Sequence, residues 1–374
     1  MKEVSGRLPK LVAEMESKEV DAMLITNLTN IRYLTGFSGS AADLAILRKD
    51  DNWYGLITTD GRYALQIEKE LTACGVSIEI EIGGVAKQSS DILKFVSCAN
   101  KIAVESEHIS LQRYTKLSAS EEISTCELVP VAGLVESVRI VKDQGEIQRI
   151  GRASSIADQA FGKVCELLVK ELSSSNKLSE ADVAIELDYQ MRLLGASESA
   201  FETIVAGGTN AAMPHHRADG SILTPGSTIV FDFGATYDGY RSDMTRTICV
   251  GEFSEPILEK MWNVVAESQS AGLLHVKAGA TGKEIDQACR EVIENAGWGD
   301  KFTHSTGHGV GLDIHEPPWI SALHEVPVAE NMILTVEPGV YIEELGGVRI
   351  EDTVVVASDG YRFLTNYPKV SNLQ

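Results

Sequence analysis

Two aspartates lie in an apolar stretch of the chain that reads FDFGATYDGYRSDMTRT (231–247). Asp232 interrupts the run TIVFDFG, and Asp243 follows eleven residues later. An unpaired charge that is buried among apolar side chains costs several kcal/mol, so both carboxylates need a compensating partner.

These two aspartates are expected to share one face of a β-hairpin. A turn centred between residues 237 and 238 sets Asp232 opposite Asp243. A two-residue turn at Asp238-Gly239 sets Asp232 opposite Thr245 and makes Asp243 the diagonal neighbour on the same face. In both registers the carboxylates are close, and two like charges ~4 Å apart repel by about 4 kcal/mol at an effective dielectric constant near 20.

A second pair of carboxylates repeats the arrangement near the C-terminus. Glu337 ends the apolar run in ILTVEPGVYI, and Glu351 lies inside GVRIEDTVVV. Their separation of fourteen residues sets them opposite each other if an odd-length loop turns around Glu344. A shared proton relieves one such pair, but two pairs favour metal, and four carboxylates match the charge of two divalent cations.

Three histidines lie in the segment HSTGHGVGLDIHEPP (304–318). Gly307, Gly309 and Gly311 allow close backbone approach and unusual backbone angles, which is expected to leave His308 facing the site. A carboxylate-rich ligand set with one imidazole suits Mn²⁺ or a similar hard ion better than structural zinc. Two-metal sites of this kind hold their ions ~3.5–4 Å apart.

The elements that position these residues divide into two predicted domains. Residues 1–137 alternate short strands and helices and are predicted to form an α/β domain with its own core. Residues 138–374 are predicted to be α+β, with antiparallel strand pairs (228–234 with 240–250, and 332–342 with 348–356) flanked by helices. Asp143 and Glu146 predict the start of a long amphipathic helix, and 281–297 predict another.

The motifs together resemble the pita-bread (creatinase/aminopeptidase) metallopeptidases, a family that includes methionine aminopeptidase, aminopeptidase P and prolidase. The resemblance covers residues from about 138 to 370 through PHH, DFGATYDGYRSDMTRT, HSTGHGVGLDIHEPP, TVEPGVYI and GVRIED. It implies five metal ligands: Asp232, Asp243, His308, Glu337 and Glu351. The N-terminal third, with TNIRYLTGFSGSAAD and TTDGRY, looks like the extra domain of the aminopeptidase P and prolidase branch.

The resemblance also implies a mechanism. A metal-bridging hydroxide would attack the carbonyl before a proline, and Glu337 would shuttle the proton. His215 and His315 match histidines that position the substrate and stabilise the tetrahedral intermediate. Arg349 matches an arginine that orients the metal-bound carboxylates, and His304 matches a second histidine of the substrate pocket.

Trp319 departs from the pattern of some prolidases, which carry an arginine there that holds the C-terminal carboxylate of the substrate. This favours a Xaa-Pro aminopeptidase, which releases the N-terminal residue from longer peptides with proline at the second position. A strict Xaa-Pro dipeptidase is the alternative. A non-catalytic binding protein on the same fold typically lacks ligands, and so does creatine amidinohydrolase, whereas this chain keeps all five.

Composition and charge exclude several other classes of protein. The chain has 374 residues and a formal net charge of −21, so it lacks the basic surface that nucleic acids or anionic membranes require. No apolar run approaches the ~20 residues of a membrane helix, and the N-terminus does not read as a signal peptide. Six scattered cysteines fit a reducing cytoplasm. The family resemblance implies a homodimer, and the ligands accept Mn, Co, Fe or Zn.

Overall fold

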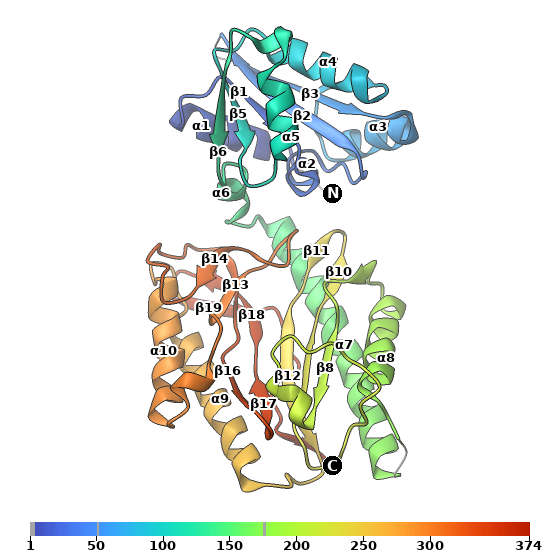
Figure 1. Cartoon of the computed structure of the whole chain (residues 1–374), viewed down its shortest axis with the longest axis vertical. Helices are drawn as coiled ribbons and strands as arrows, with labels where there is room; N and C mark the ends of the chain where they lie inside the picture. The colour runs from blue at the N-terminus through green and yellow to red at the C-terminus, as the bar shows by residue number, and fades with distance from the viewer. Residues whose placement is uncertain (1–3, 51, 175–176) are drawn as a thin grey trace. The chain divides into compact units, whose positions relative to one another are not determined.

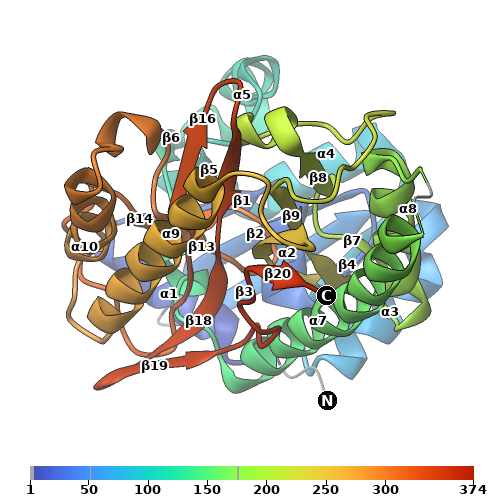
Figure 2. The ribbon, with the colours of Figure 1, turned by 90° about the horizontal axis from the view of Figure 1, so that it is seen from below.

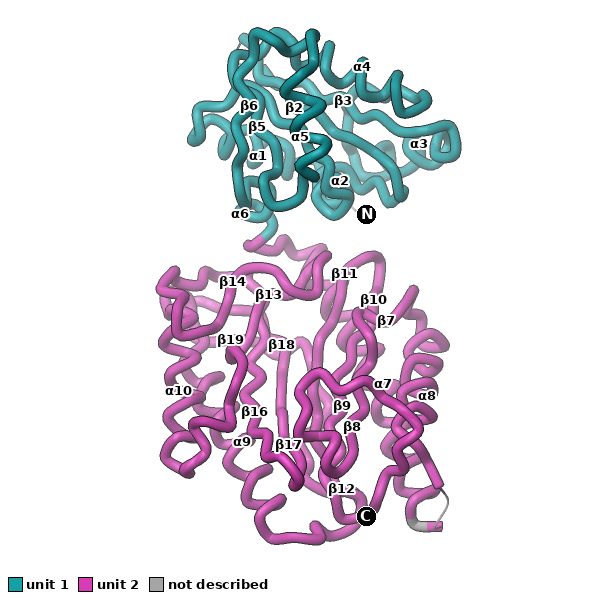
Figure 3. Tube along the Cα trace, in the orientation of Figure 1, with its two compact units in different colours: residues 1–139 teal, residues 140–374 magenta. Residues whose placement is uncertain are grey.

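The computed structural model describes residues 4–50, 52–174 and 177–374 (Figure 1). The chain forms two compact units, residues 1–139 and 140–374 (Figure 3). The boundary expected near residue 137 falls within the short helix α6 (Glu136–Arg139). No helix among the described residues combines the length and the apolarity that crossing a membrane requires.

The N-terminal unit is built on a mixed six-stranded sheet with the order β4-β3-β2-β1-β5-β6. Its central strand β1 pairs antiparallel with β2 and parallel with β5. This is the α/β arrangement that the alternating elements predict. The strands are β1 (Ala22–Ile25), β2 (Ala42–Lys49), β3 (Asn52–Thr59), β4 (Glu79–Ile82), β5 (Lys101–Glu105) and β6 (Glu127–Val131). The other helices are α1 (Arg7–Ser17), α2 (Leu28–Thr35), α3 (Ala64–Ala73), α4 (Val85–Val96) and α5 (Leu111–Ser118).

The second unit places two helix pairs on either side of its strands (Figures 1 and 2). One pair is α7 (Gln144–Ser173) with α8 (Glu180–Leu193), and the other is α9 (Pro256–His275) with α10 (Gly282–Asn295). The capping box of Asp143 and Glu146 begins α7, as the sequence predicts. The sequence pattern predicts α7 and α10 but not α8 or α9.

Four sheets carry the strands of this unit. A four-stranded sheet has the order β20-β12-β9-β8, and a five-stranded sheet has the order β14-β13-β15-β18-β19. The first comprises β8 (Ile204–Gly207), β9 (Ile229–Phe233), β12 (Met244–Val250) and β20 (Asn372–Leu373). The second comprises β13 (Gly307–Gly309), β14 (Glu316–Ile320), β15 (Ile333–Val336), β18 (Asp352–Ala357) and β19 (Gly360–Phe363). The small sheets comprise β7 (Glu198–Ser199), β10 (Ala235–Tyr237) and β11 (Tyr240–Arg241), and β16 (Gly339–Ile342) with β17 (Gly346–Arg349).

The first hairpin adopts the register of a two-residue turn. Asp238 and Gly239 both have positive φ angles, of 52° and 83°, which is the type I′ geometry that hairpins favour. Asp232 therefore pairs with Thr245 and lies diagonally from Asp243. The register that sets the two aspartates directly opposite each other is wrong.

Each predicted hairpin is divided into two strand pairs. The first divides at Gly234 into the β9–β12 and β10–β11 pairs. The second divides at Glu337 and Glu351 into the β15–β18 and β16–β17 pairs, which keep one register. Continuing that register by one residue from Val336 and Asp352 sets Glu337 opposite Glu351, as predicted. Asp243, Glu337 and Glu351 therefore lie between consecutive strands, whereas Asp232 lies within β9.

Candidate active site

Strand alternation directs Asp232 toward the site. Its neighbours Phe231 and Phe233 pack against Phe161 of α7, with ring centroids 5.1 and 5.0 Å apart. Successive side chains of a strand point to opposite faces, so Asp232 faces away from this core. Asp243 lies directly before β12 and is 4% exposed.

The second hairpin joins the first at the same place. The Glu351 backbone N–H donates to the Thr245 carbonyl oxygen at 3.1 Å, and Thr245 Oγ1 donates to Glu351 Oε2 at 2.8 Å. Because Thr245 is also the partner of Asp232 in the sheet, these bonds bring the two carboxylate pairs together.

His308 completes the cluster from β13. Its Nε2 lies 3.6 Å from Asp243 Oδ2 and 3.3 Å from Glu337 Oε1. One ligand atom each from Asp243, His308 and Glu351 lies within 4.8 Å of the others. The five predicted ligands therefore converge from three parts of the chain: the first hairpin, the segment around His308 and the second hairpin.

Glycines allow this convergence because, without a Cβ atom, they let neighbouring backbone segments approach closely. A Cβ atom at Gly307 would lie 2.1 Å from the Thr335 carbonyl oxygen, and one at Gly309 would lie 2.3 Å from that of Pro317. The unusual backbone angles expected at Gly307, Gly309 and Gly311 are wrong, since none of the three is among the described glycines with positive φ.

The cluster is electrostatically unfavourable unless cations neutralise it. Burial, followed by repulsion from neighbouring carboxylates, raises the pKa of Asp243 and of Glu351 well above their usual values. Burial also raises the pKa of Glu337 to about 8. Among the described residues, Asp232 Oδ1 and Glu351 Oε1 are buried without a hydrogen-bond partner. Buried oxygens with open lone pairs, together with one imidazole, fit divalent metal ions.

All ten residues predicted for the site line one pocket of about 450 Å³. They are His215, Asp232, Asp243, His304, His308, His315, Trp319, Glu337, Arg349 and Glu351. Their convergence follows from the fold, while the role of each residue stays a prediction.

Comparison with known proteins agrees with this geometry. Residues 148–358 match the model of metallopeptidase family M24, and residues 7–141 match the creatinase/prolidase N-terminal domain. The chain belongs to metallopeptidase family M24. The predicted pita-bread fold and the aminopeptidase P and prolidase branch are thereby confirmed, and family membership implies divalent metal ions.

Relatives within the M24 family resemble the chain over nearly its whole length. The Xaa-Pro dipeptidase of Pyrococcus furiosus is 35% identical over 96% of this chain and 97% of its own. The structure of a Xaa-Pro dipeptidase from Bacillus anthracis has 36% identity and a TM-score of 0.90, covering 98% of this chain and 99% of its own. That of an X-Pro aminopeptidase from Thermotoga maritima has 34% identity and a TM-score of 0.84, covering 96% and 100%.

Arg349 connects the Asp232 carboxylate of the M24 site to two buried hydroxyl groups. Its Nη2 donates to Asp232 Oδ2 at 2.7 Å, its Nε to Thr245 Oγ1 at 3.1 Å, and its Nη1 to the Tyr341 hydroxyl at 2.8 Å. The guanidinium thus fixes one Asp232 oxygen and leaves the other for a ligand. Tyr341 was not predicted as a site residue, although it lies in the motif TVEPGVYI, four residues after Glu337.

Burial favours the neutral form of three histidines of the M24 site, His304, His308 and His315. Burial lowers the pKa of His308 and of His304 to about 4, and it also lowers the pKa of His315. In a neutral imidazole one ring nitrogen can bind a metal ion or accept a hydrogen bond, and the other can donate one. The His304 Nε2 lies 2.9 Å from the Tyr341 hydroxyl oxygen. The His315 ring packs edge-on against the His308 ring, with 4.4 Å between the ring centroids.

Replacing Arg349 by lysine is expected to weaken metal binding or lower activity about 10–100-fold, the usual cost of losing a group that orients a metal ligand. An ammonium group is a point charge and cannot span Asp232, Thr245 and Tyr341 as the planar fork does. Calorimetric titration with Mn²⁺ measures the affinity, with the exposed Arg362→Lys as matched control. Equal affinity and activity in both variants would contradict this orienting role.

Proposed function

We propose that the chain is a metal-dependent Xaa-Pro dipeptidase, which cleaves dipeptides whose second residue is proline. The five-ligand cluster inside the pocket is the observation that carries the proposal. Relatives at 35% and 36% identity that bear the name Xaa-Pro dipeptidase support the dipeptide specificity. The sequence predicts a Xaa-Pro aminopeptidase first and a Xaa-Pro dipeptidase as the alternative. The named relatives support the dipeptidase better than the aminopeptidase.

The chain's own residues supply most of the proposed chemistry. When bound, the two metal ions would polarise the substrate carbonyl and activate a water nucleophile. Asp232, Asp243, His308, Glu337 and Glu351 would hold the ions. Glu337 would accept and return the proton, and the ring N–H groups of His215 and His315 would donate to the developing oxyanion. Arg349 would hold Asp232 in place, and His304 would border the substrate.

Release of the first residue from longer Xaa-Pro peptides is the second candidate. Trp319, which is 38% exposed and lines the pocket, supports it because no arginine occupies this position. The Thermotoga maritima relative named as an X-Pro aminopeptidase adds support at 34% identity.

Arg217 provides a cation for the carboxylate of a dipeptide. Among the described residues, the pocket is lined by two arginines, Arg349 inside the site and Arg217 at its rim. The Arg217 Nε lies 3.3 Å from Glu202 Oε2. Its side chain is 83% exposed, so it can turn toward a bound substrate. We assign Arg217 to the role that some prolidases give to the arginine missing at Trp319.

Replacing Arg217 by alanine is expected to raise KM for a Xaa-Pro dipeptide about tenfold, because a hydrogen bond to a charged group is worth ~1.5–3 kcal/mol. A longer Xaa-Pro peptide, whose carboxylate lies farther out, is expected to keep its KM. Steady-state kinetics on both substrates measures the difference, with Arg362→Ala as control. An unchanged KM for the dipeptide would remove Arg217 from this role.

The proposed metal ion, the oligomeric state and the location rest on the sequence and on the family resemblance. We propose Mn²⁺ as the preferred ion, with Co, Fe or Zn as possible replacements, since the ligands are chiefly oxygen atoms. The homodimer and the cytoplasmic location stay predictions. Light scattering of the purified protein would measure the first.

A further inference from the structure

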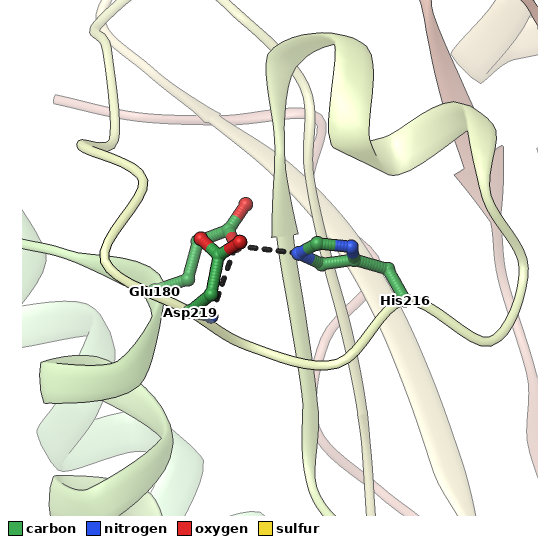
Figure 4. Close-up of side chains that lie close together, drawn as sticks. All are labelled: Glu180, His216 and Asp219. Atoms are coloured by element: carbon green, nitrogen blue, oxygen red, sulfur yellow. Dashed lines mark hydrogen bonds and ion pairs between the residues drawn. The ribbon is translucent and has the colours of Figure 1, made fainter.

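A buried carboxylate outside the metal cluster holds the segment that carries His215. Glu180 is the first residue of α8, and its side chain is 0% exposed. Figure 4 shows it facing His216, the residue next to His215. Its hydrogen-bond partners all lie in residues 207–219: Gly207 N at 2.8 Å, Asn210 Nδ2 at 3.0 Å, His216 Nε2 at 2.7 Å and Asp219 N at 3.4 Å.

The opposite side of this segment is tied to the active site. Arg349 Nη1 contacts the Pro214 carbonyl oxygen at 3.4 Å. A Cβ atom at Gly347 of β17 would lie 1.9 Å from the Ala211 carbonyl oxygen, so the backbones there are in close contact. The segment is therefore held between β17 and the start of α8.

The position of His215 depends on this backbone. Its ring makes no hydrogen bond to another described residue, and it lines the pocket beside Pro214 and His216. A shift of the segment would therefore move the His215 ring directly. Glu180 bonds to backbone or side chains on both sides of His215, which makes it the group that fixes the segment from the α8 side.

A third metal ion does not suit Glu180, His216 and Asp219, although their ligand atoms lie within 4.8 Å of one another. Each Glu180 oxygen already has two partners, and Asp219 Oδ1 accepts from the Ser221 backbone N–H at 2.7 Å. The donors and acceptors are therefore satisfied within the protein, as a structural hydrogen-bond network requires.

We propose that Glu180 is a positioning residue for catalysis, which acts by holding His215 at the distance from the metal site that the reaction requires. The inference rests on the proposed function, because His215 is taken to act on the substrate carbonyl. Misplacing a catalytic group by about 1 Å can cost on the order of 10²-fold in rate.

A double-mutant cycle between Glu180 and His215 tests this directly. Glu180→Ala is expected to lower kcat for a Xaa-Pro substrate by about 10- to 100-fold, with two bound metal ions per chain retained. In a His215→Ala background the same change is expected to cost less than about twofold, because residues that act as a unit are not additive. Glu180→Gln, which keeps an acceptor oxygen, is expected to recover part of the rate.

Asp182→Asn is the matched control. Asp182 lies in the same first turn of α8 and caps it through Ser179, and its side chain has no hydrogen bond or ion pair to a described residue of 207–219. We expect this variant to lower the melting temperature and leave kcat unchanged. If Glu180→Ala does not fold, the cycle is run with Glu180→Gln. Additive losses in the cycle, or a folded Glu180→Ala variant with wild-type kcat, would overturn the proposal.

A spectroscopic measurement separates this proposal from the proposed function. In protein labelled at histidine Cε1, Glu180→Gln is expected to shift or broaden the signal that His215→Ala identifies, whereas Asp182→Asn leaves it in place. An unmoved His215 signal would overturn the positioning role even if the enzyme is active. Failure of the wild type to cleave any Xaa-Pro peptide would instead overturn the proposed function, and the His215 signal would still decide the positioning.

Discussion

Replacing Glu337 by glutamine is expected to lower kcat/KM by about 10³-fold or more, since proton transfer by a positioned side chain contributes ~10²–10⁴-fold. The substitution keeps the shape of the side chain but removes both its proton-transfer capacity and its charge toward a metal. Glu337 suits the role because it lines the pocket and lies in the ligand cluster, with its Oε1 3.3 Å from His308 Nε2.

The control for this prediction lies on the same hairpin. Glu343 is exposed in the turn between β16 and β17, so Glu343→Gln is expected to retain wild-type kinetics. Metal content is measured in parallel to separate loss of proton transfer from loss of an ion. A Glu337→Gln variant that binds two ions and stays within tenfold of wild-type kcat would exclude Glu337 as the proton carrier.

Removing the metal ions is expected to destabilise the second unit as well as abolish activity. Four carboxylates then repel one another in a buried pocket, as the raised pKa values of Asp243, Glu337 and Glu351 indicate. A ligand present at 1,000 times its Kd stabilises a protein by about 4 kcal/mol, and 1 kcal/mol shifts Tm by ~2–4 °C in a unit of this size. Calorimetry should therefore show Tm rising by about 10 °C when Mn²⁺ is restored.

A variant of one predicted ligand distinguishes stabilisation by Mn²⁺ at the cluster from nonspecific ion binding elsewhere. Asp243→Asn removes one charge from the cluster, so it is expected to raise the Tm of the metal-free protein and to reduce the gain from Mn²⁺. The exposed Asp300→Asn serves as the control. Equal gains from Mn²⁺ in wild type and Asp243→Asn would place the stabilising ion elsewhere.

The metal cluster was predictable because carboxylates in apolar strands contradict the pattern around them. Asp232 and Glu351 interrupt runs that otherwise read as buried strands, and an uncompensated charge there is costly. The hairpin register then limits how far apart the pairs can lie. The sequence did not decide between two possible turns of the first hairpin. In the structure the positive φ angles of Asp238 and Gly239 correspond to the two-residue turn.

Other parts of the structure depend on contacts that no local pattern reveals. The helix α8 escaped prediction because it has two apolar stripes: one is buried (Val183, Leu187, Met191), and the other is exposed (Ile185, Tyr189, Leu193). Its amphipathic signal is therefore weak. Glu180 contacts His216, 36 residues away, and Tyr341 contacts His304, 37 residues away, so these contacts follow only from the folded chain.

The most direct test is hydrolysis by metal-stripped protein, with and without Mn²⁺. The substrates are a Xaa-Pro dipeptide, a Xaa-Pro-Xaa tripeptide and a longer Xaa-Pro peptide. We predict Mn²⁺-dependent cleavage of the dipeptide and little cleavage of the others. Release of the first residue from the longer peptides would make the enzyme an aminopeptidase. Cleavage of no peptide by protein with two bound ions would contradict the account.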